Sequence, residues 1–281
     1  MSNLATRTIS GIFFAAIIVA AIMFSPATFA LLFGVISAVC VWEFCTLINS
    51  RKNIRANRLI STISAVYLFF AILAFTTEAV GPQIFVPYLL TIVYLLISEL
   101  YLHRSTPLEN WATAFASQLY IALPVALVNV LAFKSNPYYA SISYVPEIPL
   151  ALMVFLWTND MGAYCFGSTL QRFVPAKLFP SISPHKSWIG SIGGALLTIA
   201  ASAVFAHFST SMPLVKWMGM AATVVIFGTW GDLVESQLKR TLGVKDSGRF
   251  LPGHGGALDR FDSSLMAIPC VVIYFYIVEM L

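Results

Sequence analysis

Residues 231–262 read GDLVESQLKRTLGVKDSGRFLPGHGGALDRFD, and this stretch differs sharply from the chain around it. Positions 232–262 hold 10 of the chain's 28 charged residues (16 basic and 12 acidic), whereas 59% of the whole sequence is hydrophobic. Charge in or beside a bilayer is costly, so by default it marks a functional site. Acidic residues hold metal ions, basic residues hold phosphate, and glycines let a backbone approach a ligand closely. The stretch therefore predicts a polar site on an apolar scaffold.

The composition of the whole chain indicates an integral membrane protein rather than a soluble enzyme, because only 10% of its 281 residues are charged. The net charge of +4 is therefore no sign of nucleic-acid binding. No linker or low-complexity tract divides the chain, so we expect one polytopic membrane domain over 1–281. Its N-terminal helices would occupy 1–135, and its catalytic helices and cytoplasmic loops would occupy 148–281. The cysteines lie in apolar surroundings and are interpreted as packing residues: Cys40, Cys45, Cys165 and Cys270.

Apolar runs of bilayer-spanning length, or close to it, recur nine times. They predict an all-α integral membrane protein that is polytopic, with about nine transmembrane helices. The first run lacks a small-residue cleavage site, so we expect a retained helix rather than a signal peptide. The nine runs cover 8–24, 27–48, 59–76, 82–101, 116–133, 148–167, 188–208, 213–235 and 263–281.

The distribution of Lys and Arg predicts how these helices are oriented. If the N-terminus is cytoplasmic and the chain alternates, the C-terminus lies on the outer side. Fourteen of the 16 basic residues then face inward, and only Lys134 and Lys216 face outward, as the positive-inside rule expects. Residues 105–117 are expected to form an interfacial helix. The inward loops are 49–58, 102–115, 168–187 and 236–262, of which the first is interpreted as a topology anchor that also attracts anionic headgroups.

Two pairs of acidic residues in the charged stretch have the same spacing. Asp232 and Glu235 share one helix face with Ser236 near the end of the eighth run, and Asp259 and Asp262 repeat the spacing where the ninth begins. If the two helix ends are neighbours, three or four carboxylates converge, which suits Mg²⁺. For Asp259, capping of the helix start remains an alternative. For Asp232, expected near a helix C-terminus, metal ligation is favoured.

Basic residues and glycines lie between the acidic pairs. Lys239, Arg240 and Lys245 precede Gly253-His254-Gly255-Gly256. A basic run alone is usual for a cytoplasmic loop, but together with the acids and glycines it is typical of a polyphosphate-binding segment. There is no GxxxxGK[ST] pattern, so this segment is no P-loop.

A second polar patch lies earlier in the chain. Asn159 and Asp160 interrupt an apolar run, and a buried carboxylate such as Asp160 would need Lys186, a metal or a substrate group as its partner. Three glycines follow, and they favour helix packing over ligand contact: Gly190, Gly193 and Gly194.

The order of these residues resembles a known signature. The pattern Ser236-x-x-Lys239-Arg240-x4-Lys245-Asp246-x-Gly248-x3-Pro252-x-His254-Gly255-Gly256-x2-Asp259-Arg260-x-Asp262 is similar to that of phosphatidate cytidylyltransferases. The blocks around Asn159-Asp160 and Ser183-Pro184-x-Lys186-x-Trp188 resemble further landmarks of that family, in the same order. Three positions depart from the family pattern in the 168–189 region: Ser168, His185 and Ile189.

The resemblance implies an activity, in which CTP and phosphatidic acid give CDP-diacylglycerol and pyrophosphate. It also implies a multi-pass protein of a bacterial-type inner (plasma) membrane, with the site on the cytoplasmic face, and it suggests a homodimer. Asp232 and Asp259 would be direct ligands of one or two Mg²⁺ ions, with Asp262 and Glu235 completing or orienting the shell.

The resemblance further divides the polar residues between catalysis and binding. Lys239 and Arg240 would neutralise the triphosphate and the leaving pyrophosphate, beside the catalytic acids. The substrate-binding residues would be Ser236, Lys245, Asp246, His254, Gly255, Gly256, Asn159, Asp160 and Lys186.

Two other functions remain open from the residues. A CTP-dependent polyprenol kinase would need the same kind of cation and phosphate site, but it would release CDP instead of pyrophosphate. An ion-coupled transporter would use Asp160, Asp232 and Asp259 as a proton or cation path near the bilayer midplane.

Overall fold

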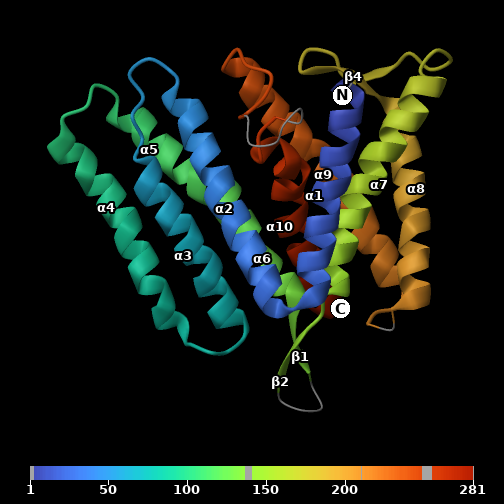
Figure 1. Cartoon of the computed structure of the whole chain (residues 1–281), viewed down its shortest axis with the longest axis horizontal. Helices are drawn as coiled ribbons and strands as arrows, with labels where there is room; N and C mark the ends of the chain where they lie inside the picture. The colour runs from blue at the N-terminus through green and yellow to red at the C-terminus, as the bar shows by residue number, and fades with distance from the viewer. Residues whose placement is uncertain (1–2, 137–140, 210, 249–254, 281) are drawn as a thin grey trace. The chain divides into compact units, whose positions relative to one another are not determined.

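The computed structural model of the chain describes residues 3–136, 141–209, 211–248 and 255–280 (Figure 1). Most of these residues are helical, which confirms the all-α class. The described part also contains two short antiparallel hairpins. They pair β1 (Phe133–Asn136) with β2 (Ser141–Tyr144), and β3 (Lys177–Phe179) with β4 (Ser183–Ser187).

The chain divides into two compact units. The first unit consists of Met1–Pro146 and Asp246–Phe261, and the second consists of Glu147–Lys245 and Asp262–Leu281. The signature is therefore divided between the units. Its part from Asp246 to Phe261 belongs to the first unit, and the rest belongs to the second.

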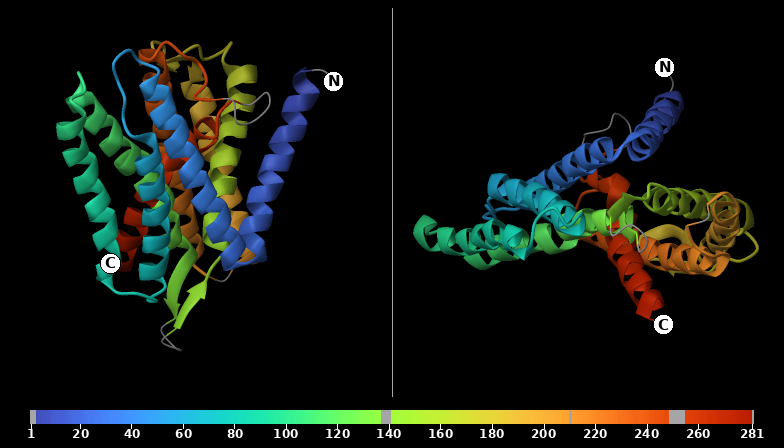
Figure 2. Two further views of the ribbon diagram at one scale, coloured as in Figure 1. Left: turned by 60° about the vertical axis from the view of Figure 1, so that its left-hand side comes forward. Right: turned by 90° about the horizontal axis from the view of Figure 1, so that it is seen from below.

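In the first unit, α3 lies between α2 and α4 (Figure 2). Apolar side chains such as those of Phe29, Phe33 and Phe69 are fully buried here, and the Phe29 and Phe33 rings are 4.9 Å apart. The helices of this unit are α1 (Asn3–Phe24), α2 (Pro26–Asn49), α3 (Arg58–Thr76), the 3₁₀ turn η1 (Pro82–Phe85), α4 (Val86–Leu102), α5 (Pro107–Ala116), the π-helical turn η2 (Ser117–Ala122) and α6 (Leu123–Ala132).

The expected interfacial helix at 105–117 is wrong as a separate element. Helix α5 runs through η2 into α6, so that Pro107–Ala132 form one helical segment of 26 residues. The π-helical turn keeps the backbone hydrogen-bonded where a break was expected, and such turns often occur at functional or strained positions.

The second unit contains α7 (Glu147–Leu170), α8 (Trp188–Phe208), α9 (Leu214–Thr241) and α10 (Leu258–Met280) from Asp262 onward. Glycines allow α7 and α8 to pack closely: a Cβ on Gly162 would lie 2.8 Å from Gly194 Cα, and one on Gly190 would lie 2.7 Å from the Ala163 carbonyl oxygen. A Cβ on Gly193 would overlap the Phe166 side chain. These contacts agree with the helix-packing interpretation of the three glycines.

Seven helices of the described residues are long and apolar enough to cross a membrane. Each of the nine predicted runs falls on a helical segment, but two of those segments do not qualify. In α1 the apolar stretch Ile9–Phe24 is short, and α7 includes Glu147, Asn159 and Asp160, which lower its hydropathy. The chain is therefore a multi-pass membrane protein, whereas nine crossings and the sides of the two termini stay predictions.

Helix α9 is longer than the sequence pattern predicted. It ends at Thr241 rather than near 235, so Lys239 and Arg240 lie in its last turn and not in a loop. Positive charge in a last turn is favourable beside the helix dipole, which helps the helix continue past its apolar part. Asp232 consequently lies well inside the helix, not at its C-terminal end.

Of the four cysteines interpreted as packing residues, two are buried, one is partly buried and one is exposed. Cys40 and Cys45 are buried and Cys270 is partly buried, but Cys165 is exposed on α7.

Candidate functional site

A close approach of α9 and α10 sets the geometry of the polar site in the second unit. A Cβ on Gly231 would lie 2.7 Å from the backbone oxygen of Asp262 and 3.1 Å from Ser263 Cα. Only a glycine lets the two backbones come this close, because backbone atoms have no room to move aside. Asp232, the next residue of α9, is thereby placed near Asp262.

Four carboxylates are gathered around this approach. Asp262 lies within electrostatic range of Asp232, Glu235 and Asp160. We call these four residues the carboxylate cluster. Grouped negative charges repel one another, so cations close by stabilise such a cluster.

Two lysines supply part of that positive charge. Lys186 of β4 forms an ion pair with Asp232, and Lys239 pairs with Glu235, whose side chain is fully buried. The Ser236 hydroxyl donates to Asp232 Oδ1 at 3.1 Å. The structure thus brings together seven of the residues predicted for the site, and it pairs Lys186 with Asp232.

The residue types of the cluster suit a divalent cation, although its side chains are not arranged around one point. Within the described ranges, no three acidic, histidine or cysteine side chains are close enough to hold a metal ion. The donors are nevertheless all carboxylate oxygens, the ligands that Mg²⁺ accepts, and their negative charge exceeds that of the two paired lysines. The residues present therefore fit a hard divalent cation.

A cavity of about 260 Å³ adjoins the cluster. Asn159 is buried beside it, where its Nδ2 lies 3.5 Å from Thr229 Oγ1, and its Oδ1 has no hydrogen-bond partner among the described residues. Asp160 lines the cavity too, but it is exposed, so its prediction as a buried carboxylate is wrong. The cavity opens at the molecular surface there, which spares Asp160 the cost of burial. The lining includes Asn159, Asp160, His185, Lys186, Thr229 and Asp232.

Thr229 and His185 were not chosen as site residues from the sequence. Thr229 precedes Asp232 by three positions and shares its helix face, so the spacing alone could have indicated it. His185 was noted only as a departure from the family pattern, and its place next to Lys186 on β4 puts it at the cavity.

The rest of the signature lies in the first unit. Asp259 Oδ2 accepts hydrogen bonds from Ser247 N at 2.9 Å and from Gly256 N at 2.8 Å. Gly255 adopts a positive φ of 81°, and a Cβ there would lie 2.6 Å from Asp259 Oδ2. The Gly256 amide, expected to face a phosphate, donates to Asp259 instead. Both amides lie before α10, so these contacts fix the residues that precede the helix, and both capping and metal ligation by Asp259 stay predictions.

The remaining predicted residues are less constrained. Arg240, Lys245 and Asp246 are exposed, as suits residues that would meet a soluble nucleotide. His254 lies outside the described residues.

Comparison with known proteins decides between the open alternatives. The sequence profile described as the Cytidylyltransferase family matches residues 5–278. The chain belongs to the cytidylyltransferase family. It is similar to the phosphatidate cytidylyltransferase of Haemophilus influenzae, with 26% identity over 283 residues that cover 94% of this chain and 95% of that protein.

Two staphylococcal phosphatidate cytidylyltransferases match part of this cytidylyltransferase more strongly. The protein of Staphylococcus haemolyticus is 43% identical over 134 residues, covering 47% of this chain and 50% of its own length. The protein of Staphylococcus aureus is 44% identical over 125 residues, covering 43% of this chain and 45% of its own length. Membership of the family confirms the resemblance and makes the chain a nucleotidyltransferase of the membrane.

Proposed function

We propose that this chain is a membrane phosphatidate cytidylyltransferase that converts CTP and phosphatidic acid into CDP-diacylglycerol and pyrophosphate. The family match over residues 5–278 supports the chemistry. The observation that carries the proposal is the carboxylate cluster, which lies beside a cavity into which Lys186 also faces. An acidic cluster for a cation and a lysine for phosphate are the parts that phosphoryl and nucleotidyl transfer require.

The reaction needs positioning and charge neutralisation rather than covalent catalysis. A phosphate oxygen of the lipid attacks the α-phosphorus of CTP, and the bond to the β-phosphate oxygen breaks as pyrophosphate leaves. The lipid phosphate is already largely dianionic at neutral pH, so no protein base is needed to create the nucleophile. Lys186 in the cavity, and Lys239, Arg240 and Lys245 beyond it, would offset the negative charge of both substrates.

One or two Mg²⁺ ions are proposed as cofactors, which would neutralise phosphate charge and orient the transferred group. Asp232 and Asp262 are the candidate ligands in the second unit, with Glu235 in support. Asp259 stays a predicted ligand through the signature that it shares with the family.

The cytoplasmic face is proposed from the charges at the ends of each unit. In the first unit, the start of α1 and the α2–α3 and α4–α5 connections lie at the end opposite the β1–β2 hairpin (Figure 1). The two connections carry four Lys or Arg residues, and Arg58 follows at the start of α3, whereas the hairpin carries Lys134. In the second unit, the β3–β4 hairpin and the last turn of α9 lie at the end opposite the α8–α9 connection. Excess Lys and Arg at one end supports a cytoplasmic orientation of that end.

A homodimer, suggested by the family resemblance, is proposed without further support.

Product analysis tests the proposal. Purified protein in mixed micelles is given phosphatidic acid and CTP labelled in the cytidine, with and without Mg²⁺. The proposal predicts labelled lipid and an equal amount of pyrophosphate, both dependent on the metal. Release of CDP with phosphorylation of a polyprenol would identify a kinase instead. Ion movement in proteoliposomes without CTP consumption would identify a transporter.

A further inference from the structure

Glu43 lies in the first unit, outside the signature, and it contacts Ser247 and Leu258 at the two described ends of the signature segment. It belongs to α2, six residues before that helix ends at Asn49, or about 9 Å along the axis. Its Oε2 accepts a hydrogen bond from Leu258 N at 3.0 Å. The same oxygen lies 3.5 Å from the Ser247 hydroxyl.

Leu258 is the first residue of α10, and the amides of a first turn have no acceptor within their own helix. A carboxylate at this position satisfies one of these amides and interacts favourably with the positive end of the helix dipole. Glu43 therefore stabilises the start of the helix that carries Asp259 and Asp262.

Two glycines of the signature leave the space that the Glu43 carboxylate fills. A Cβ on Gly248 would lie 2.5 Å from Glu43 Oε1, and a Cβ on Gly256 would overlap Glu43 Oε2 and Ser247 Oγ. The absence of side chains at these two positions is thus explained by contact with Glu43.

Glu43 and Asp259 together hold the two described ends of the segment. Asp259 binds the amides of Ser247 and Gly256, while Glu43 binds the Leu258 amide and the Ser247 hydroxyl. Ser247 at one end and Gly256–Leu258 at the other are therefore fixed by carboxylates from α2 and α10.

We infer that Glu43 is a positioning residue for the nucleotidyl transfer: it fixes Ser247 and the start of α10. The inference rests on the proposed function for its effect on the reaction, but the contacts themselves are independent of it. Glu43 acts as a hydrogen-bond acceptor here, and it takes no part in bond breaking.

The test compares Glu43→Gln with Glu43→Ala in the purified full-length protein. The amide oxygen of Gln accepts the same hydrogen bonds, so we expect kcat/KM for CTP to fall less than about fivefold. Ala removes the acceptor for Leu258 N and Ser247, and we expect a loss of about 10- to 100-fold, because small misplacements are costly in such reactions. Glu109→Ala removes an exposed acid of the same unit and should behave as wild type.

A second readout is hydrogen–deuterium exchange without nucleotide or metal. In Glu43→Ala the peptide with Leu258 should exchange about 5- to 10-fold faster, while peptides of α3 keep their wild-type rate. Glu43→Gln should stay near wild type. If Ala does not yield folded protein, Glu43→Gln provides the kinetic comparison and its exchange pattern the structural one.

Three outcomes would overturn the inference. Wild-type kinetics and exchange in Glu43→Ala would mean that the contacts position nothing. A Glu43→Gln variant as inactive as Glu43→Ala, with wild-type exchange, would give Glu43 a chemical task. Faster exchange over the whole first unit would mean that Glu43 stabilises the unit as a whole and does not position one segment of it. If wild-type protein transfers no cytidylyl group, the proposed function fails, while the exchange experiment still decides on the contacts.

Discussion

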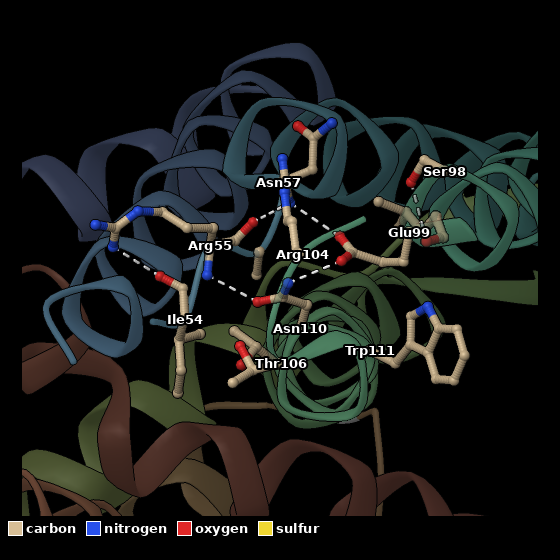
Figure 3. A network of polar contacts seen from close by, with 12 residues as sticks. Ile54, Arg55, Asn57, Ser98, Glu99, Arg104, Thr106, Asn110 and Trp111 are labelled. Atoms are coloured by element: carbon tan, nitrogen blue, oxygen red, sulfur yellow. Dashed lines mark hydrogen bonds and ion pairs between the residues drawn. The ribbon is translucent and has the colours of Figure 1, made fainter. Parts of the chain in front are cut away.

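Two groups of charged residues, one in each unit, are built in opposite ways. In the first unit, buried Glu99 accepts from Arg104 Nη1 at 2.9 Å with one oxygen and from Asn110 Nδ2 at 2.8 Å with the other (Figure 3). Asn110 Oδ1 accepts in turn from Arg55 N at 2.7 Å, and Arg104 also donates to the Arg55 carbonyl. We call these four residues the Glu99 network.

The carboxylate cluster of the second unit is built mostly from charges of one sign. It holds four acids and two paired lysines, next to a cavity. In the Glu99 network each carboxylate oxygen has a donor, and the bonds join α4, the start of α5 and the α2–α3 connection. The comparison indicates that a balanced buried network fixes the fold, whereas an excess of one charge beside a cavity indicates a site for ligands of the opposite charge.

The largest expected effect is that of Asp232→Asn. Loss of one negative charge from the cluster should lower the rate of cytidylyl transfer by about 10³-fold, because a cation site contributes several kcal/mol to phosphate chemistry. The rate is measured with labelled CTP in micelles, and folding is checked by size-exclusion chromatography. A near-normal rate with unchanged Mg²⁺ dependence would show that Asp232 is not a metal ligand.

Gly231→Ala tests the geometry of the cluster without changing its charge. The new Cβ would meet the Asp262 backbone oxygen at 2.7 Å, so α9 and α10 have to move apart. We expect a loss of about 10- to 100-fold in kcat. Gly243→Ala is the control: its φ of 71° makes it strained, at a cost of about 1 kcal/mol, but no described atom lies within 4 Å of the added Cβ. Equal activity of the two variants would show that the close approach is unimportant.

Glu99→Gln should affect stability and leave chemistry alone. Removing the charge weakens the bond to Arg104, which is partly exposed, and we expect a loss of about 1–3 kcal/mol in the free energy of unfolding. Thermal unfolding in detergent measures the loss. Activity per folded molecule should equal that of wild type, and a large fall in it at low temperature would contradict the contrast between the two regions.

Thr229→Val should have the smallest effect. It removes the hydroxyl 3.5 Å from Asn159 Nδ2, a long and weak contact, so we expect a 2- to 5-fold fall in kcat/KM. Thr223→Val on the same helix is the matched control, since its hydroxyl donates to Gly219 O of its own helix. A larger fall than for Gly231→Ala would mean that Thr229 contacts substrate directly.

Each apolar run predicted from the sequence falls on a helical segment, because long apolar runs form membrane helices. The sequence predicted Asp232, Glu235 and Ser236 on one helix face because helical spacing alone fixes that relation. It placed the end of α9 too early, since hydropathy marks where the membrane ends and not where the helix ends.

Contacts between segments that are far apart in the sequence cannot be predicted from local sequence patterns. Glu43 is 215 residues from Leu258, and nothing in the local pattern of α2 predicts that its carboxylate binds the start of α10. The exposure of Asp160 likewise depends on how α7, α8 and β4 surround the cavity, which periodicity does not specify.

The most direct test measures Asp232→Asn and Glu99→Gln side by side, each for transfer of labelled cytidylyl groups into lipid and for thermal unfolding. The account predicts that Asp232→Asn is folded and almost inactive, while Glu99→Gln is less stable and active per folded molecule. Full activity in Asp232→Asn, or loss of activity in well-folded Glu99→Gln, would contradict the assignment of catalysis to the carboxylate cluster.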